Sequence, residues 1–135
     1  MKAVLVDSSV VLDLFTADPV FYDRSLACIA AWGAKGDILI DEAIYAEISI
    51  GFTRIEELDE AIFGAGFLFS PAPREALFLA GKAFRSYRRR GGTKTAPLPD
   101  LIIGAHAAIS GIPLLTRDPK RIRDAFPGVF IIDPS

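Results

Sequence analysis

Two stretches of the sequence, AVLVD at residues 3–7 and PLLTRD at residues 113–118, share one pattern, an apolar run that is followed by a carboxylate. Short apolar runs of this kind are typical of strands that are buried on both faces. In an open parallel sheet, ligands bind beyond the carboxyl ends of the strands. We therefore expect Asp7 and Asp118 to share a small volume at one edge of a sheet, where neighbouring negative charges recruit a cation. A site made only of oxygen ligands suits Mg²⁺ or Mn²⁺ better than zinc.

The chain around these two stretches alternates between strand-like and helical segments. Strands are predicted at residues 2–7, 37–40, 67–69, 113–116 and 129–132. Helices are predicted at residues 8–15, 20–32, from 41 or 42 to about 50, and at 55–65, 74–90, 99–110 and 119–125. Five strands separated by helices imply right-handed crossovers, and therefore an α/β fold with a mostly parallel sheet that is covered on both faces.

Length and composition favour one domain over residues 1–135. The 135 residues are 51% hydrophobic and 24% charged, which is enough apolar material for a sizeable core. Asp7 interrupts the apolar start too early for a signal peptide, and the uncharged stretch 101–116 is shorter than the roughly 20 residues of a spanning helix. We expect a soluble, cytoplasmic protein. Cys28 is the only cysteine, which excludes an internal disulfide and a cysteine-based zinc site.

Charge is distributed unevenly along the chain. Residues 1–73 hold twelve acids and four bases, whereas residues 74–135 hold five acids and eleven bases. The bases include a cluster without intervening acids: Lys82, Arg85, Arg88, Arg89, Arg90 and Lys94. Such a cluster can bind phosphates. A solvated helix end, whose cations complement the helix dipole, explains the cluster equally well.

Further carboxylates could join Asp7 and Asp118. Asp100 falls in the first turn of a predicted helix, where capping is the simpler explanation. The helix after the second strand offers Asp41, Glu42 and Glu47. An acid such as Glu47 most often lies on the wet face of an amphipathic helix, so the pattern alone favours that interpretation.

Four motifs, taken in order, resemble those of PIN-domain ribonucleases of the VapC toxin type. They are VDSSV at residues 6–10, YAE at residues 45–47, APLPDLIIGAHA at residues 96–107 and LLTRDP at residues 114–119. Each motif alone is weak, but their order and spacing along nearly the whole chain are specific. The resemblance implies a five-stranded PIN-like sheet in the order 3-2-1-4-5, which puts the first and fourth strands side by side.

The resemblance also implies a function, a metal-dependent endoribonuclease that is toxic until an antitoxin blocks its site. The catalytic and metal-binding residues of the family correspond to Asp7, Glu47, Asp100 and Asp118, with Mg²⁺ or Mn²⁺ as the cofactor. Its hydroxyl positions correspond to Ser9 and Thr116, which would orient the carboxylates. The implied partners are RNA, a VapB-like antitoxin and a second copy of the chain.

In this interpretation the RNA backbone would contact Arg85, Arg88, Arg89, Arg90, Lys94 and Arg117. A surface ion pair is the alternative for Arg117. His106, the only histidine, lies six residues after Asp100 and so points to another face of their helix, which favours a structural role. The family's antitoxin groove suggests that one or two of Phe15, Phe21, Phe63, Phe67 and Phe69 are exposed. Phe21 is the first choice, because it falls off the predicted buried stripe of Tyr22, Leu26 and Ile29.

Two other classes of protein compete with this interpretation. A phosphoryl-transfer or receiver-like domain could use Asp7 as a nucleophile, but Ser9 stands where such hydrolases place a second aspartate, and the acidic pair of receivers is absent. A noncatalytic RNA-binding or regulatory module would bind RNA without metal and cleave nothing. Metal-dependent cleavage that is lost in an acid variant separates all three.

Overall fold

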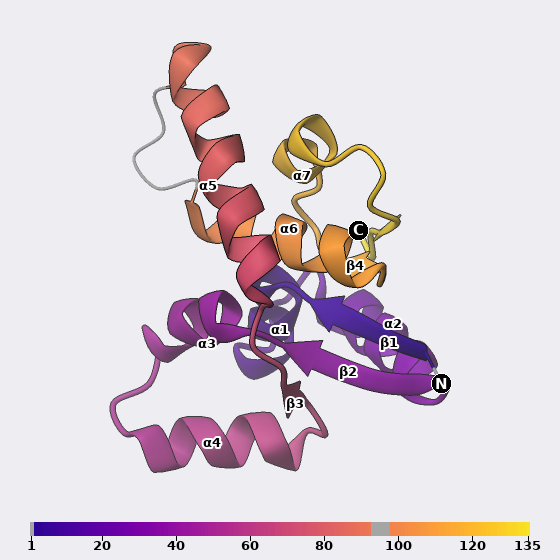
Figure 1. The fold of residues 1–135 in the computed structure, drawn as a ribbon. Helices are drawn as coiled ribbons and strands as arrows, with labels where there is room; N and C mark the ends of the chain where they lie inside the picture. The colour runs from indigo at the N-terminus through magenta and orange to yellow at the C-terminus, as the bar shows by residue number, and fades with distance from the viewer. Residues whose placement is uncertain (1, 93–97) are drawn as a thin grey trace.

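The structure is a computed structural model, and it describes residues 2–92 and 98–135. Its strands are β1 (Lys2–Val6), β2 (Gly36–Ile40), β3 (Leu68–Phe69), β4 (Leu114–Leu115) and β5 (Ile131–Ile132). They form one sheet in the order β3-β2-β1-β4-β5, and every neighbouring pair is parallel. The predicted α/β class and strand order are confirmed, and the sheet is parallel throughout (Figure 1).

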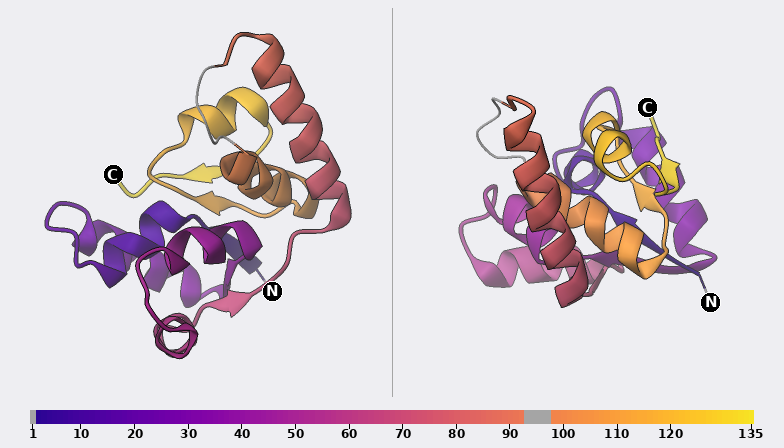
Figure 2. Two further views of the ribbon diagram at one scale, coloured as in Figure 1. Left: turned by 90° about the vertical axis from the view of Figure 1, so that its left-hand side faces the viewer. Right: turned by 45° about the horizontal axis from the view of Figure 1, so that its top comes forward.

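Helices connect the strands within the described residues. They are α1 (Ser8–Phe15), α2 (Tyr22–Gly33), α3 (Glu42–Ser49), α4 (Ile55–Gly64), α5 (Arg74–Arg89), α6 (Leu98–Ser110) and α7 (Lys120–Ala125). The first four gather on one side of the molecule and the last three on the other, and the far end of α5 projects away from the sheet (Figures 1 and 2). None of the helices in residues 2–92 and 98–135 has the length and apolar character needed to cross a membrane.

The centre of the sheet is apolar because β1 and its neighbours are covered on both faces. Val4, Leu5 and Val6 of β1 are buried, as are Leu114 and Leu115 of β4. Leu5 pairs with Leu114 and Val6 with Leu115, so β1 and β4 end at the same level. Asp7 and Thr116, the next residue of each strand, therefore lie next to each other at the carboxyl edge. This register creates the place for a site.

Two glycines allow close approaches that a side chain would block. A Cβ atom on Gly36, at the start of β2, would lie 1.3 Å from the carbonyl oxygen of Lys2. A Cβ atom on Gly104 of α6 would lie 2.7 Å from the ring of Phe126, which follows α7. Gly36 thus lets β2 pair with β1, and Gly104 lets the end of α7 pack onto α6. The second contact brings α7 over the first turn of α6.

The predicted buried face of α2 is wrong in part. Leu26 is 41% exposed, whereas Ser25 is fully buried and its hydroxyl donates to Asp13 Oδ2 at 2.7 Å. The choice of Phe21 as the most exposed phenylalanine is also wrong, because the guanidinium carbon of Arg117 lies 4.0 Å from the centre of its ring and Phe21 is half-buried. Phe63 and Phe69 are the exposed members of the group, at 50% and 44%, whereas Phe67 is buried.

Candidate metal-binding and catalytic site

Asp7 is the centre of a hydrogen-bond cluster at the carboxyl edge of the sheet. Its Oδ2 atom accepts a hydrogen bond from Ser9 Oγ at 2.9 Å and from Thr116 Oγ1 at 2.8 Å. The Thr116 hydroxyl in turn accepts the backbone N–H of Asp118 at 3.1 Å. The Thr116 hydroxyl therefore links the ends of β1 and β4, and the two hydroxyls predicted to orient carboxylates both contact Asp7.

The Asp7 carboxylate is held in a poorly solvated place, with 9% of its surface exposed. Burial raises its pKa, and the hydrogen bonds from Thr116 and Ser9 oppose that rise without cancelling it. Since burial is costly for an unpaired charge, the site gains stability from any cation that approaches Asp7.

Three of the predicted carboxylates line one small cavity. Asp7, Asp100 and Asp118 enclose it together with Thr116 and three aliphatic side chains, Ile103, Leu114 and Ile122. Its volume is about 10 Å³, which corresponds to roughly one water-sized sphere. The sequence prediction that these three side chains meet therefore agrees with the geometry, although their catalytic role remains a prediction.

An arginine from α7 reaches the same cavity. Arg121 donates through Nη1 to Asp100 Oδ2 in an ion pair, and both side chains are mostly buried. Within the described part of the chain, no group of three or more histidine, cysteine or acidic side chains has the spacing of a metal site. The guanidinium of Arg121 therefore lies beside one of the three carboxylates of the cavity.

Glu47 lies beside the cavity without lining it. Ser8 Oγ donates to Glu47 Oε1 at 2.9 Å, which ties α3 to the start of α1. Burial is the main cause that raises the pKa of Glu47, and the Ser8 hydroxyl partly lowers it. The charges of Asp7, Asp100 and Asp41 raise the pKa further, so Glu47 lies within the electrostatic reach of the cluster. Glu47 is the only one of these acids that was expected, on pattern alone, to face water.

Arg117, predicted either to bind RNA or to form an ion pair, is engaged with Asp13. Its Nε and Nη2 atoms donate to the two Asp13 carboxylate oxygens at 2.7 and 2.8 Å. Its backbone N–H donates to Ser9 Oγ at 3.2 Å, next to Asp7. Asp13 is buried, and sequence reasoning missed it, although one acid inside the apolar run of α1 was an available signal. This ion pair fixes the loop that carries Asp118.

The predicted RNA-binding residues of α5 are solvent-accessible. Arg85, Arg88 and Arg89 are exposed on its last turns, and so is Arg90, the residue that follows. Arg90 also lines a larger cavity of about 530 Å³, which extends to Asp118. Lys94 lies outside the described residues. The contact of these side chains with RNA remains a prediction.

His106 has a structural environment, as expected. Its Nδ1 atom lies 2.9 Å from Oδ2 of Asp41, and both side chains are buried. Asp41 also accepts the backbone N–H of Ile44 at 3.0 Å, which caps α3. A role for Arg121 was not predicted. The sequence does not distinguish it from Arg123, two residues later in the same basic stretch, and only the packing of α7 gives the two different surroundings.

Comparison with known proteins agrees with this geometry. The structure is similar to the Rickettsia felis VapBC2 complex bound to a promoter DNA fragment (TM-score 0.73, 16% identity, 98% of both chains). It is also similar to VapBC-1 of nontypeable Haemophilus influenzae (TM-score 0.71, 16% identity, 98% of both chains). A toxin-antitoxin complex from Klebsiella pneumoniae aligns with a TM-score of 0.67 and 20% identity over 98% of both chains. At these identities the likeness shows the fold alone.

No curated protein matches the sequence significantly. A family model does match: the PIN domain model covers residues 4–125, which include the last three residues of β1, all of β4 and all four predicted acidic positions. The chain therefore belongs to the PIN domain family.

Proposed function

We propose that this protein is a metal-dependent endoribonuclease that hydrolyses RNA phosphodiester bonds at the carboxyl edge of its sheet. One observation carries the proposal: Asp7, Asp100 and Asp118 line a single small cavity at the end of β1 and β4. Membership of the PIN domain family supports it, since nuclease activity is typical of that family. A cluster of carboxylates without a cation would repel the phosphates of RNA, so the reaction needs added positive charge.

The donor set fits Mg²⁺ or Mn²⁺. All candidate ligands are carboxylate oxygens, and the burial that raises the pKa of Asp7 is a cost that a divalent cation would offset. Asp7, Asp100 and Asp118 would hold the ion, and Glu47 would complete the set from α3. When bound, the ion would supply positive charge toward the phosphate and lower the pKa of a water molecule.

The side chains of the chain itself would prepare this reaction. The hydroxyls of Ser9 and Thr116 would hold Asp7 in one orientation, because both donate to the same carboxylate oxygen. Arg121, which donates to Oδ2 of Asp100, would hold that carboxylate in place or exchange it for a phosphate when substrate binds. Burial, which raises the pKa of Glu47, disfavours its charge, so a bound cation would stabilise the ionised form that joins the ligand set.

Metal-dependent cleavage tests the proposal. Purified protein should cut RNA with millimolar Mg²⁺ or Mn²⁺ and stop when EDTA is added. Asp100→Asn should reduce the rate by orders of magnitude with the fold retained, because it weakens the ion's ligand set. Mg²⁺ should also raise the Tm of the wild-type protein by mass action on the native state, and less so that of the variant. Cleavage that persists in EDTA would contradict the assignment.

We further propose that the protein acts as a VapC-type toxin with a VapB-like antitoxin as its partner and that it forms a homodimer. The sequence motifs and the fold shared with VapBC complexes support this proposal. An antitoxin segment could place a cation at Asp7 and Asp100, where it would compete both with metal and with Arg121. A gene for a small DNA-binding protein beside the toxin gene, whose product abolishes cleavage, is the expected finding.

A noncatalytic RNA-binding or regulatory module remains the second candidate. The exposed arginines at the end of α5 would serve either function. The two candidates differ in one measurement: a binding module would retain RNA without metal and produce no new RNA ends.

A further inference from the structure

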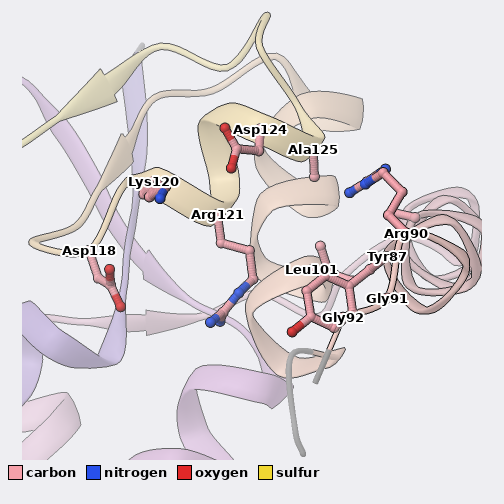
Figure 3. A pocket seen from close by; sticks show the side chains of 11 residues that line it. Tyr87, Arg90, Gly91, Gly92, Leu101, Asp118, Lys120, Arg121, Asp124 and Ala125 are labelled. Carbon is pink, nitrogen blue, oxygen red and sulfur yellow. The ribbon is translucent and has the colours of Figure 1, made fainter. Parts of the chain in front are cut away.

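A second cavity adjoins the acidic site on the side of α5 and α7. Its volume is about 530 Å³, a size that accommodates a small organic ligand such as one nucleotide. Tyr87 and Arg90 line it from the end of α5, Leu101 from α6, and Lys120, Arg121 and Asp124 from α7. Figure 3 shows Arg121 extending from α7 into the space between Asp118 and the end of α5.

The lining combines two kinds of surface. Ala83, Leu101 and Ala125 give it an apolar part, and the ring of Tyr87 adds an aromatic wall. Arg90, Lys120 and Arg121 place three cations around the same space, against the two carboxylates of Asp118 and Asp124. Apolar surface and cations together match a nucleotide, whose base is flat and largely apolar on its faces and whose phosphate is anionic.

The two cavities are adjacent, because they share a lining residue. Asp118 lines both of them. Arg121 lines the larger cavity and pairs with Asp100, which lines the smaller one. A ligand in the larger cavity therefore lies one side chain away from the carboxylates. This position suits a neighbouring nucleotide of the same RNA strand.

We propose that the larger cavity binds the RNA nucleotide next to the phosphodiester bond that is cleaved. The inference rests on the proposed nuclease function and adds a location and a recognition mode to it. The base occupies the apolar part beside Ala83 and Leu101, and the phosphate contacts Lys120 and Arg121. Arg121 thereby exchanges the Asp100 carboxylate for a phosphate when RNA binds.

Binding of small probes tests the cavity without any cleavage. The full-length protein is titrated calorimetrically, in EDTA, with the four nucleoside 5′-monophosphates and with ribose 5-phosphate. At least one monophosphate should bind about tenfold more tightly than ribose 5-phosphate, because the base adds contacts with the apolar part and the Tyr87 ring. Ala83→Leu, which fills the apolar part, should abolish that preference. Equal binding of ribose 5-phosphate and all four monophosphates would overturn the proposal.

Substitutions of the cations separate the phosphate contact from general charge. Lys120→Gln and Arg121→Gln should each weaken monophosphate binding about tenfold, the scale of one lost hydrogen bond to a charged group. Arg123→Gln is the matched control, since Arg123 is exposed on the same helix and lines neither cavity. Lys120 is exposed, so its variant should fold normally. A similar loss in all three variants would contradict a specific contact.

RNA kinetics decide whether the occupant belongs to the substrate. With Mg²⁺ present, Ala83→Leu and Lys120→Gln should raise KM for RNA more than they lower kcat, the mark of lost ground-state binding. An unchanged KM, together with weakened monophosphate binding, would mean that the cavity takes free nucleotides, and the proposal would fail. If the wild-type protein cleaves no RNA at all, the nuclease proposal fails, whereas a monophosphate preference that Ala83→Leu removes would still support a nucleotide site.

Discussion

At the scale of single residues, one carboxylate oxygen organises the candidate site. Oδ2 of Asp7 accepts hydrogen bonds from the hydroxyls of Ser9 and Thr116. The Thr116 hydroxyl also accepts a hydrogen bond from the backbone N–H of Asp118. These contacts orient a charged group that burial disfavours. The protein therefore keeps a carboxylate in a place that lowers its stability, which is typical of functional sites.

Asp7→Asn should raise the stability of the metal-free protein at neutral pH while it abolishes metal-dependent cleavage. The pKa of Asp7 in the folded chain lies above its ordinary value of 3.8, so the native state binds a proton more readily than the unfolded state. The free energy of unfolding then falls as pH rises from about 3.8 through the raised pKa. Above that range the ionised side chain destabilises the folded state. The variant should gain Tm at pH 7, by about 4 °C for each kcal/mol.

The gain should shrink as the pH falls toward 4, because the wild-type Asp7 then becomes protonated in the folded state. Thermal melts in EDTA across this pH range measure the effect. Glu60→Gln on exposed α4 is the control and should change Tm little at any pH. A lower Tm for Asp7→Asn at pH 7 would refute the argument from burial.

At the scale of elements, an internal ion pair fastens three segments together. Asp13 of α1 accepts two hydrogen bonds from Arg117, in the loop after β4, and one from Ser25 of α2. The Arg117 guanidinium also covers the ring of Phe21 just before α2. The loop that presents Asp118 is thus fixed by groups far from it in the sequence.

Arg117→Leu should lower the free energy of unfolding by about 2–3 kcal/mol, because it leaves the buried Asp13 carboxylate without its cation. This is below the full cost of breaking a buried pair, since 24% of the Arg117 side chain is exposed. Urea denaturation provides the measurement. Arg54→Gln, which removes the exposed pair with Glu56, should cost about 0.5 kcal/mol or less. Equal losses in the two variants would show that the Asp13 pair has no special role.

The last turns of α5 lead to a prediction about RNA affinity. Replacing Arg85, Arg88 and Arg89 with glutamine should weaken RNA binding and reduce the slope of log affinity against log salt by about 2, at roughly 0.7 for each phosphate contact on a single strand. Fluorescence anisotropy of labelled RNA in EDTA measures the slope at several salt concentrations. Arg74→Gln, at the opposite end of the same helix, is the control. An unchanged slope would show that these arginines form a solvated helix end and do not contact RNA.

The elements were predictable because each is defined locally by apolar runs, proline and glycine. The strand order was also predicted, but from the family resemblance and not from any local signal. The buried face of α2 was not predictable. Ser25 faces the pair that Asp13 forms with Arg117 and donates to Asp13, and only folding brings these distant residues together. The exposure of Phe21 was mispredicted for the same reason, because its ring is covered by Arg117, which is distant in the sequence.

The candidate site was predictable in its carboxylates and not in its cations. Asp7, Asp100 and Asp118 meet because strand ends and a helix start converge at one edge. Arg121 reaches Asp100 because Gly104 permits close packing of Phe126 against α6, a contact between residues that no sequence pattern joins. The nucleotide-sized cavity beside them likewise exists only once α5, α6 and α7 are assembled.

At the scale of the whole molecule, exposed aromatic side chains lie at one edge of the sheet. Phe69 of β3 is 44% exposed and Phe63 of α4 is 50% exposed. An antitoxin that binds here should lose at least about tenfold in affinity when both are changed to serine, the scale of an interface hot spot. Phe130→Ser is the control, because Phe130 is also exposed, at 64%, and lies just before β5 at the other edge of the sheet.

If the proposed antitoxin exists, the measurement is its inhibition of RNA cleavage by this protein. The double variant should resist inhibition without slower cleavage, since neither phenylalanine lines the acidic cavity. If both variants are inhibited as well as the wild-type protein, the antitoxin binds elsewhere.

Acidic α4 and the arginine-bearing end of α5 lie at opposite ends of the molecule (Figures 1 and 2). The chain therefore forms an electric dipole, although its formal net charge is only −2. If RNA is the substrate, we expect this dipole to turn an approaching RNA molecule toward the end of α5, because α4 repels its phosphates. The same asymmetry should let the protein bind a cation-exchange resin at pH 7 in low salt, a behaviour that its pI of about 5.3 would not suggest.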